Sequence, residues 1–229
     1  MLRAFLARLQ PWRPAPELDP LTAYGLWAAT YPPEAYNPLM RAEEAAVLDL
    51  LPREGVRGGH ALDLACGSGR YLRHLKERGA ESVAGLDLSV EMLARARAFQ
   101  PDLVRATMLS LPLSSGSFHL ILCGLAVGHL PDLAPAMREV GRVLKPGGVV
   151  IYSDFHPFGH LAGWKRAFHA NGREYTVQHH LHLYAEHHAA CLGAGLTIEA
   201  LREPRALDES GRPAWGNAPV VLVVRARKG

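Results

Sequence analysis

The stretch ALDLACGSGR, residues 61–70, predicts a buried strand that runs through a tight turn into a helix. Helical spacing after the two glycines places Tyr71, Leu72 and Leu75 on one face. The glycines lack a Cβ atom, so the backbone can turn sharply and let a ligand come close. The first N–H groups of the helix have no partners within it and are free to bind that ligand. This strand–turn–helix unit is typical of nucleotide sites in α/β proteins.

A second acid indicates which kind of nucleotide suits this unit. The apolar run Ser82–Leu86 ends at Asp87, 18 residues beyond Gly69, where α/β folds place a carboxylate on the ribose hydroxyls. A dinucleotide-binding turn would need a third glycine at position 72, which is a leucine in this chain. Asp63, four residues before Gly67, would repel a diphosphate but favour a cationic ligand. The two acids therefore favour a nucleoside-like cation over a dinucleotide.

Several spaced segments resemble the class I S-adenosylmethionine-dependent methyltransferases. They are Asp63–Gly69, Gly85–Ser89, Leu111–Leu113, Phe118–Leu122 and Leu144–Gly148. The first is similar to the family's cofactor-binding motif and the second to its ribose-binding motif, and the likeness covers roughly residues 35 to 155. The resemblance implies S-adenosylmethionine as the cofactor. It also implies an α/β, doubly wound, seven-stranded and mostly parallel sheet with an antiparallel last strand.

The later part of the chain is similar to the type 11, small-molecule branch of this family. The similarity lies in Leu192–Ile198 and in Glu203-Pro204. That branch includes enzymes of quinone and biotin-precursor metabolism, so the resemblance implies methyl transfer to an oxygen or carbon nucleophile on a small molecule. Methylation of DNA amino groups is disfavoured because Pro32-Pro33 lies outside the fourth strand and forms no Asn/Asp-Pro-Pro-Tyr motif. Two alternatives stay open: an S-adenosylmethionine-binding protein without catalysis, and a nicotinamide-dependent oxidoreductase.

Composition fits one globular domain of 229 residues, with 48% hydrophobic and 21% charged residues. The net charge is only +3 and no basic stripe occurs, so no nucleic-acid partner is expected. Three cysteines at no metal or redox spacing, and no secretory leader, favour a cytoplasmic protein without a membrane partner. Met1–Gln10 is amphipathic and is interpreted as a docked helix, a membrane-surface contact or a frayed tail. A homodimer is left open.

The alternation of patterns predicts the order of elements around this unit. Helices are expected at 21–30, 38–51, 69–78, 89–99, 131–144 and 184–194, and strands at 60–65, 82–87, 102–107, 117–123, 147–153, 196–203 and 218–227. The single domain 1–229 is expected to divide into an N-terminal helical lid (1–55), a cofactor-binding core (60–154), a substrate-cap insertion (155–183) and a segment that completes the sheet (184–229).

The resemblance assigns cofactor contacts to residues at the ends of the strands and in the N-terminal helices. Expected contacts are Asp63, Ala65, Cys66, Gly67 and Gly69 in the first turn, Asp87 and Leu88 at the ribose, Thr107 and Met108 at the adenine, Cys123, Gly124 and Leu125 at the sulfonium, and Tyr24 and Tyr36 above it. Thr107-Met108 departs from the acid–small pair that relatives often carry. For Cys66, filling space is the alternative to reactivity, because no activating base lies near it in sequence.

Histidines supply the candidate catalytic groups. His129 follows the fourth strand, where neutral imidazole can orient a substrate or accept its proton, or can simply fix the loop. His156 is the second candidate base, although a carboxylate or enolate acceptor would need none. The segment 169–188 is rich in histidine and is interpreted as pocket lining, as an exposed strand with His180 and His182 on one face, or as a metal site. No metal is expected, because no carboxylate or cysteine stands at a typical spacing.

Overall fold

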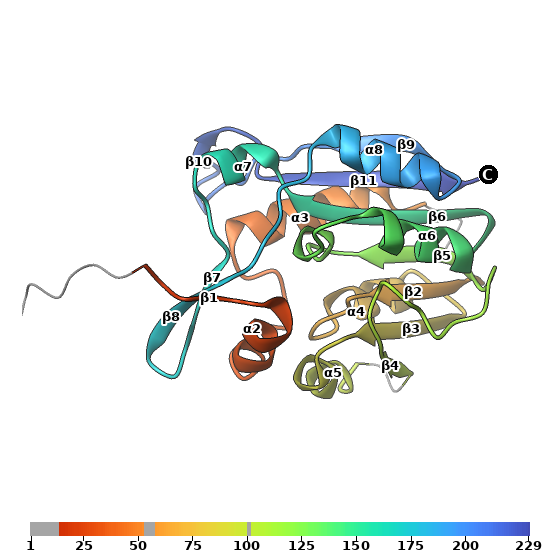
Figure 1. Ribbon diagram of the computed structural model, residues 1–229, viewed down its shortest axis with the longest axis horizontal. Coiled ribbons are helices and arrows are strands. Elements are labelled where there is room, and N and C mark those ends of the chain that lie inside the picture. Colours follow the sequence, from red (N-terminus) through yellow and green to blue (C-terminus); the bar gives the residue numbers. More distant parts are fainter. Residues whose placement is uncertain (1–13, 53–57, 100–101) are drawn as a thin grey trace, which may run out of the picture.

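The computed structural model describes residues 14–52, 58–99 and 102–229, and it contains two sheets (Figure 1). The larger sheet has seven strands in the order β4-β3-β2-β5-β6-β11-β9. Its strands are β2 (His60–Leu64), β3 (Ser82–Asp87), β4 (Leu103–Arg105), β5 (Phe118–Cys123), β6 (Leu144–Phe155), β9 (Leu196–Arg202) and β11 (Val221–Lys228). The smaller sheet has the order β1-β8-β7, with β1 (Glu17–Leu18), β7 (Ala167–Ala170) and β8 (Arg173–Val177).

Six of the described helices lie close to the positions that the sequence predicts, whereas α7 was not predicted. They are α2 (Pro20–Trp27), α3 (Pro38–Leu50), α4 (Arg70–Glu77), α5 (Val90–Ala96), α6 (Ala134–Val143), α7 (Pro157–Leu161) and α8 (Tyr184–Gly193), with a 3₁₀ turn η1 (Val127–His129) and a further short strand β10 (Ala214–Asn217). Helices α2 and α3 each begin with a proline behind a capping side chain, Asp19 and Asn37 respectively. None of the described helices is long and apolar enough to span a membrane.

The seven-stranded sheet confirms the expected fold class. Strands β2 to β6 are parallel, whereas β11 runs antiparallel between β6 and β9. In register, Asp63 of β2 lies beside Gly85 of β3 on one side and Leu122 of β5 on the other. The strand order changes direction between β2 and β5, so the carboxyl ends of β2, β3 and β5 meet at the point where such sheets bind ligands.

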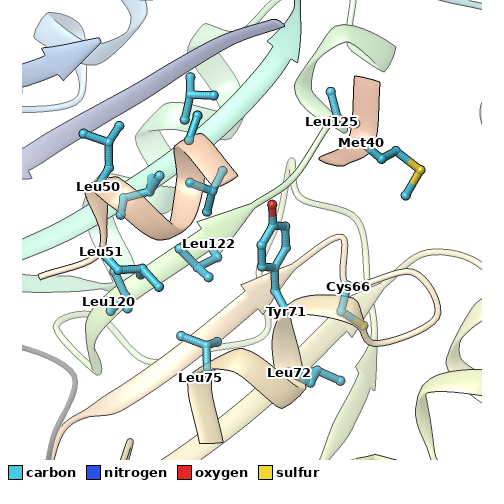
Figure 2. Close-up of a cluster of buried hydrophobic side chains, with 14 of the residues drawn as sticks. Met40, Leu50, Leu51, Cys66, Tyr71, Leu72, Leu75, Leu120, Leu122 and Leu125 are labelled. Carbon is cyan, nitrogen blue, oxygen red and sulfur yellow. The ribbon is translucent and has the colours of Figure 1, made fainter. Parts of the chain in front are cut away.

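Helices cover both faces of this sheet, which explains why its strands read as nearly continuous apolar runs. One face packs against α3, α4 and α5, and Figure 2 shows Tyr71 and Leu75 of α4 near Leu122 of β5 and Leu51 beyond α3. The opposite face packs against α6 and α8, where Met137 is among the buried residues. Because side chains on both faces bury the central strands, the sheet is a rigid base for the residues at its carboxyl edge.

The smaller sheet joins the N-terminal segment to the segment that follows β6. Strand β1 pairs in parallel with β8 of the β7–β8 hairpin, and α2 packs against them. Trp27 of α2 stacks on Phe168 of β7 with 4.9 Å between ring centroids. In Figure 1 this unit lies to the left of the larger sheet, beside the ends of its central strands. Sequence patterns predicted neither the hairpin nor its pairing with β1.

The structure contradicts one expectation, and a second lies outside the described residues. The expected strand with His180 and His182 on one face is wrong, because β8 ends at Val177 and residues 178–183 are irregular. Contacts with the loop after β5 hold this segment instead: the His180 N–H donates to the Gly128 carbonyl at 2.7 Å, and His182 Nε2 bonds the Leu130 carbonyl at 2.8 Å. The expected helix at Met1–Gln10 lies outside the described residues.

Candidate functional site

Two neighbouring cavities open at the carboxyl ends of the central strands. The smaller cavity measures about 360 Å³ and the larger about 610 Å³, and both are lined by Tyr31 and Arg166. The smaller cavity brings together most of the predicted cofactor residues, with His129: Tyr24, Ala65, Gly67, Asp87, Leu88, Thr107, Met108, Gly124, Leu125 and His129. Tyr36 lines the larger cavity instead.

The turn after β2 forms one end of the smaller cavity. Gly67 adopts the left-handed conformation, with φ at +53°, and a Cβ atom built on it would meet nothing within 4 Å. Its N–H donates to Asp87 Oδ2 at 2.8 Å, and the Ser89 N–H donates to Asp87 Oδ1 at 2.9 Å. Burial raises the pKa of Asp87. Each carboxylate oxygen has a second lone pair, so Asp87 can still accept hydrogen bonds from a ligand.

Four of the predicted contacts lie under the cavity and do not line it. Asp63 is buried, burial raises its pKa, and its Oδ2 has no hydrogen-bond partner among the described residues. Cys66 and Cys123 are buried, and burial raises the pKa of both thiols, which makes them poor nucleophiles. Gly69 is where α4 begins, and a Cβ atom there would come within 3.1 Å of the Phe99 side chain. We conclude that these residues shape the site from below.

Two residues at the cavity carry left-handed backbone without being glycine. Ala65 follows β2 with φ at 57°, and Leu125 follows β5 with φ at 54°. Such conformations cost of the order of 1–3 kcal/mol and persist only where the surroundings enforce them. For Leu125 the enforcement is visible: its N–H donates to Ser153 Oγ at 2.8 Å, and that hydroxyl donates to Glu43 Oε1 at 2.7 Å. The loop that borders the cavity is therefore fixed from α3.

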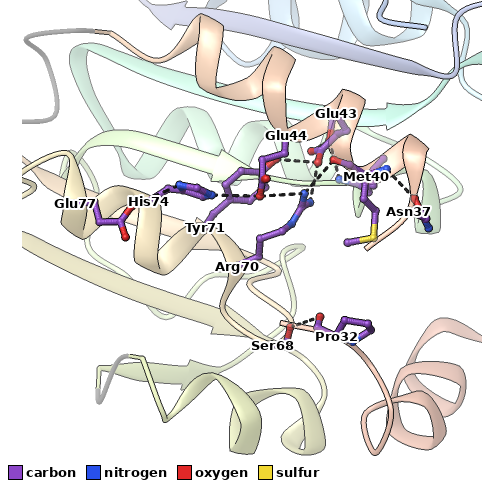
Figure 3. Close-up of polar contacts among 12 residues, drawn as sticks. Pro32, Asn37, Met40, Glu43, Glu44, Ser68, Arg70, Tyr71, His74 and Glu77 are labelled. Carbon is purple, nitrogen blue, oxygen red and sulfur yellow. Dashed lines mark hydrogen bonds and ion pairs between the residues drawn. The ribbon is translucent and has the colours of Figure 1, made fainter. Parts of the chain in front are cut away.

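Glu43 is the centre of a buried polar network between α3 and the sheet (Figure 3). Besides the Ser153 hydrogen bond, its carboxylate accepts a hydrogen bond from the Tyr71 hydroxyl, with 2.8 Å between the oxygens, and pairs with Arg70 Nη2 at 2.7 Å. Arg70 in turn lines the smaller cavity. Because both oxygens of Glu43 are bonded and its charge is neutralised, this network stabilises the wall of the cavity.

His129 and Tyr24, 105 residues apart in sequence, meet above the cavity. The Tyr24 hydroxyl lies 3.0 Å from His129 Nε2, and His129 Nδ1 lies 2.9 Å from the Gln178 carbonyl oxygen. A carbonyl only accepts, so Nδ1 carries the proton and Nε2 accepts from Tyr24. Burial and the neighbouring Arg166 lower the pKa of His129 to about 3. This geometry favours a neutral, orienting imidazole, and the role of proton acceptor stays a prediction.

Comparisons with known proteins agree with this geometry. A family model described as a methyltransferase domain matches residues 62–152. An S-adenosylmethionine-dependent methyltransferase from Mesorhizobium loti is 32% identical, with a TM-score of 0.67, over 82% of this chain and 98% of that one. The chain belongs to the S-adenosylmethionine-dependent methyltransferases.

Curated relatives of this methyltransferase match it over shorter spans. A malonyl-[acyl-carrier protein] O-methyltransferase from Enterobacter lignolyticus is 37% identical over 57% of this chain and 51% of that protein. A demethylmenaquinone methyltransferase from Chlorobaculum tepidum is 39% identical over 42% of this chain and 40% of that protein. The chain thus spans about half the length of the curated relatives it matches, or less.

The residues of the smaller cavity fit the cofactor of this family. The open space above Gly67 leaves room for a ligand against the backbone of the turn. Asp63 supplies a buried acid with an unused oxygen beneath that turn, and Asp87 supplies acceptors at the end of β3. A carboxylate attracts a sulfonium ion or an ammonium group and accepts hydrogen bonds from ribose hydroxyls.

The second predicted base of the methyltransferase, His156, is not brought together with His129. His156 Nδ1 accepts the Phe158 N–H at 3.2 Å and so caps α7, while its Nε2 bonds Glu203 Oε1 at 3.1 Å. Among the described residues that line the two cavities, His156 is absent. The geometry gives His156 a capping and pairing role, and catalysis by it stays a prediction.

Two candidate functional residues, Asp154 and Arg166, were not predicted from the sequence. Asp154, at the end of β6, accepts from His179 Nε2 at 3.0 Å, and the His179 ring lies 5.9 Å from that of His129 and lines the larger cavity. Arg166, in the segment after α7, reaches both cavities. The only sequence signal was Asp154 directly after a predicted strand; nothing marked Arg166.

The histidine-rich segment of the methyltransferase does not gather into one centre. His169 and His188 are exposed, whereas His182 and His187 are buried on the side of α8. Within the described part of the chain, no three His, Cys, Asp or Glu side chains are placed to hold a metal ion.

Proposed function

We propose that this methyltransferase binds S-adenosylmethionine in the smaller cavity and methylates a small molecule that occupies the larger one. The observation that carries this proposal is that the two cavities adjoin and share Tyr31 and Arg166. When bound, the cofactor supplies a methyl group made electrophilic by a positively charged sulfur. The protein then has to hold the two molecules in line and to exclude water.

The proposed roles follow from where the side chains lie. Asp87 would accept the ribose hydroxyls and Gly67 would allow close approach of the amino-acid part. Leu125 and the Tyr24–His129 pair border the region between the cavities, and we assign them to orienting the reacting groups. Thr107 and Met108 would pack along the adenine, since both line the cavity beyond Asp87. An oxygen or carbon acceptor is favoured because relatives are named malonyl-[acyl-carrier protein] O-methyltransferase and demethylmenaquinone methyltransferase.

We also propose that residues 1–55 act as a lid and residues 155–183 as a substrate cap on the core at 60–154, with 184–229 completing the sheet. Support comes from α2, whose Tyr24 accepts a hydrogen bond from Arg166 of the cap. A cytoplasmic location agrees with three free, buried cysteines. A homodimer stays a prediction that light scattering would test.

Calorimetric titration with S-adenosylhomocysteine tests cofactor binding. Asp87→Asn should weaken affinity about tenfold to a hundredfold, because hydrogen bonds to a charged acceptor contribute about 1.5–3 kcal/mol. Asp49→Asn is the matched control, since Asp49 is an exposed acid of α3 paired with Arg202, and its affinity should not change. Equal affinities for both variants would remove Asp87 from the site. Binding without turnover, in a panel of acceptors with labelled cofactor, would favour the non-catalytic alternative.

A further inference from the structure

Arg166 carries a charge that no acid of the described chain neutralises. Its Nη1 donates to the Tyr24 hydroxyl and to the Leu125 carbonyl oxygen at 3.1 Å. No Asp or Glu oxygen of the described residues lies within 4.0 Å of it, and its Nε and Nη2 have no described hydrogen-bond partner. Arg70, by contrast, is paired with Glu43 at 2.7 Å. A partly buried guanidinium with unused donors is costly unless an anion pairs with it.

The larger cavity is positively charged around this guanidinium. Besides Tyr31 and Tyr36, its other ionisable lining residues are Glu17, His160, Lys165 and His179. The single carboxylate among them, Glu17, is already paired with Lys165 Nζ at 3.2 Å. The smaller cavity differs, because Asp19 and Asp87 both line it. An anion is therefore attracted to the side of Arg166 that faces the larger cavity.

The same cavity is aromatic. Six of its lining residues are Trp27, Tyr31, Tyr36, Phe155, Trp164 and Trp215. The Arg166 guanidinium lies 5.0 Å from the centre of the Phe155 ring and 5.8 Å from that of Tyr24. These two rings restrict the orientation of the guanidinium plane. Its Nε and Nη2 donors are then positioned to bind the two oxygens of a carboxylate.

We propose that Arg166 binds the carboxylate of an aromatic acceptor whose ring lies among the aromatic side chains of the larger cavity. The inference rests on the proposed function, in which this cavity takes the methyl acceptor. The competing assignment is that Arg166 pairs with the carboxylate of the cofactor's amino-acid part, because Arg166 also lines the smaller cavity. The two assignments differ in which ligand loses affinity when the guanidinium is removed.

The experiment is calorimetric titration of the protein saturated with S-adenosylhomocysteine. The probes are benzoate, 4-hydroxybenzoate and 2-naphthoate, each compared with its uncharged amide of the same shape. We expect the wild type to bind at least one carboxylate about tenfold or more tightly than its amide. The reason is that hydrogen bonds between a guanidinium and a carboxylate are stronger than those between a guanidinium and a neutral amide. Arg166→Gln should abolish that preference and leave the amide affinity unchanged.

Two controls separate the explanations. Lys165→Gln removes a neighbouring positive charge that is 61% exposed, and should change the preference less than about threefold. Because Arg166 also contacts Tyr24 and Leu125 at the smaller cavity, Arg166→Gln should lose much less affinity for S-adenosylhomocysteine than it loses preference for the carboxylate. An equal loss of both would place the guanidinium on the cofactor and overturn the inference.

Absence of a carboxylate preference in all three wild-type pairs also overturns the inference, and needs no folded variant. A wild type that fails to bind S-adenosylhomocysteine at all would instead refute the proposed function. The two failures are therefore distinguishable.

Discussion

Glu43 and Asp154 are both buried acids near the cavities, but their surroundings differ. Both oxygens of Glu43 are bonded, to Arg70, Tyr71 and Ser153. Asp154 accepts from the Phe155 N–H and from His179 through Oδ1, while its Oδ2 has no hydrogen-bond partner among the described residues and lies 3.9 Å from His187 Nε2. A satisfied network contributes rigidity, whereas a buried acid with an unbonded oxygen contributes less to stability. We call the Glu43 network the sheet side of the site and the His179–Asp154 pair its cap side.

Breaking the sheet-side network should have the largest effect on the stability of the fold. Glu43→Gln removes the charge that neutralises the buried Arg70, and breaking a buried pair costs about 3–5 kcal/mol in the free energy of unfolding. Urea unfolding followed by circular dichroism measures this loss. Glu34→Gln is the matched control, because Glu34 is 69% exposed and pairs with Arg73 at the surface, so it should cost less than about 1 kcal/mol. Equal losses in the two variants would contradict the contrast.

A larger side chain beside the His179–Asp154 pair should have an intermediate effect on stability. A Cβ atom on Gly128 would lie 2.0 Å from His179 Nε2 and 2.3 Å from Asp154 Oδ1, so Gly128→Ala has to push this pair apart. We expect a loss of about 1–3 kcal/mol, as for overpacking elsewhere, visible as a lower melting temperature.

Gly193 in α8 offers the comparison, since a Cβ atom there meets nothing within 4 Å. Gly193→Ala should be neutral or stabilising by up to about 1 kcal/mol. If Gly128→Ala melts no lower than Gly193→Ala, the His179–Asp154 pair is looser than described.

The smallest effect at neutral pH concerns His129. Its pKa is about 6.5 in an unfolded chain and about 3 in the folded protein, because burial and Arg166 disfavour the charged form. Between these values the unfolded state binds the proton and the native state does not, so stability falls as the pH is lowered from about 6.5 towards 3. His129→Gln removes this contribution and should flatten the decline.

The difference between the two unfolding curves is the quantity to compare. Asp63 and Asp87, whose raised pKa values act in the opposite direction, are present in both proteins and largely cancel. Curves that stay parallel from pH 7 to pH 4 would show that His129 titrates normally in the folded protein.

Sequence reasoning predicted the parts of the site that are local. Gly67 and Asp87 belong to short segments in which strand, turn and acid follow one another, so spacing alone predicted that both lie at one site. The seven-stranded, mostly parallel sheet with an antiparallel last strand came with the family resemblance and is confirmed. The turn and the acid that line the smaller cavity are therefore predictable from the amino-acid sequence.

The cap side could not be predicted, because its contacts join distant segments. Arg166 meets Tyr24 across 142 residues, and Ser153 meets Glu43 across 110. No periodicity or spacing encodes such pairs. The two-residue spacing of His180 and His182 suggested a strand. In the structure this segment is irregular, and a hydrogen bond from the His180 N–H to the Gly128 carbonyl holds it.

The pairing of β1 with β8 has a consequence for the walls of both cavities. The Thr176 N–H donates to the Pro16 carbonyl at 2.9 Å and the Gln178 N–H to the Leu18 carbonyl at 2.8 Å, so the hairpin and the segment before α2 are stitched together by main-chain bonds. A displacement of the hairpin would therefore displace the segment before α2 as well, so the walls of both cavities depend on these main-chain contacts.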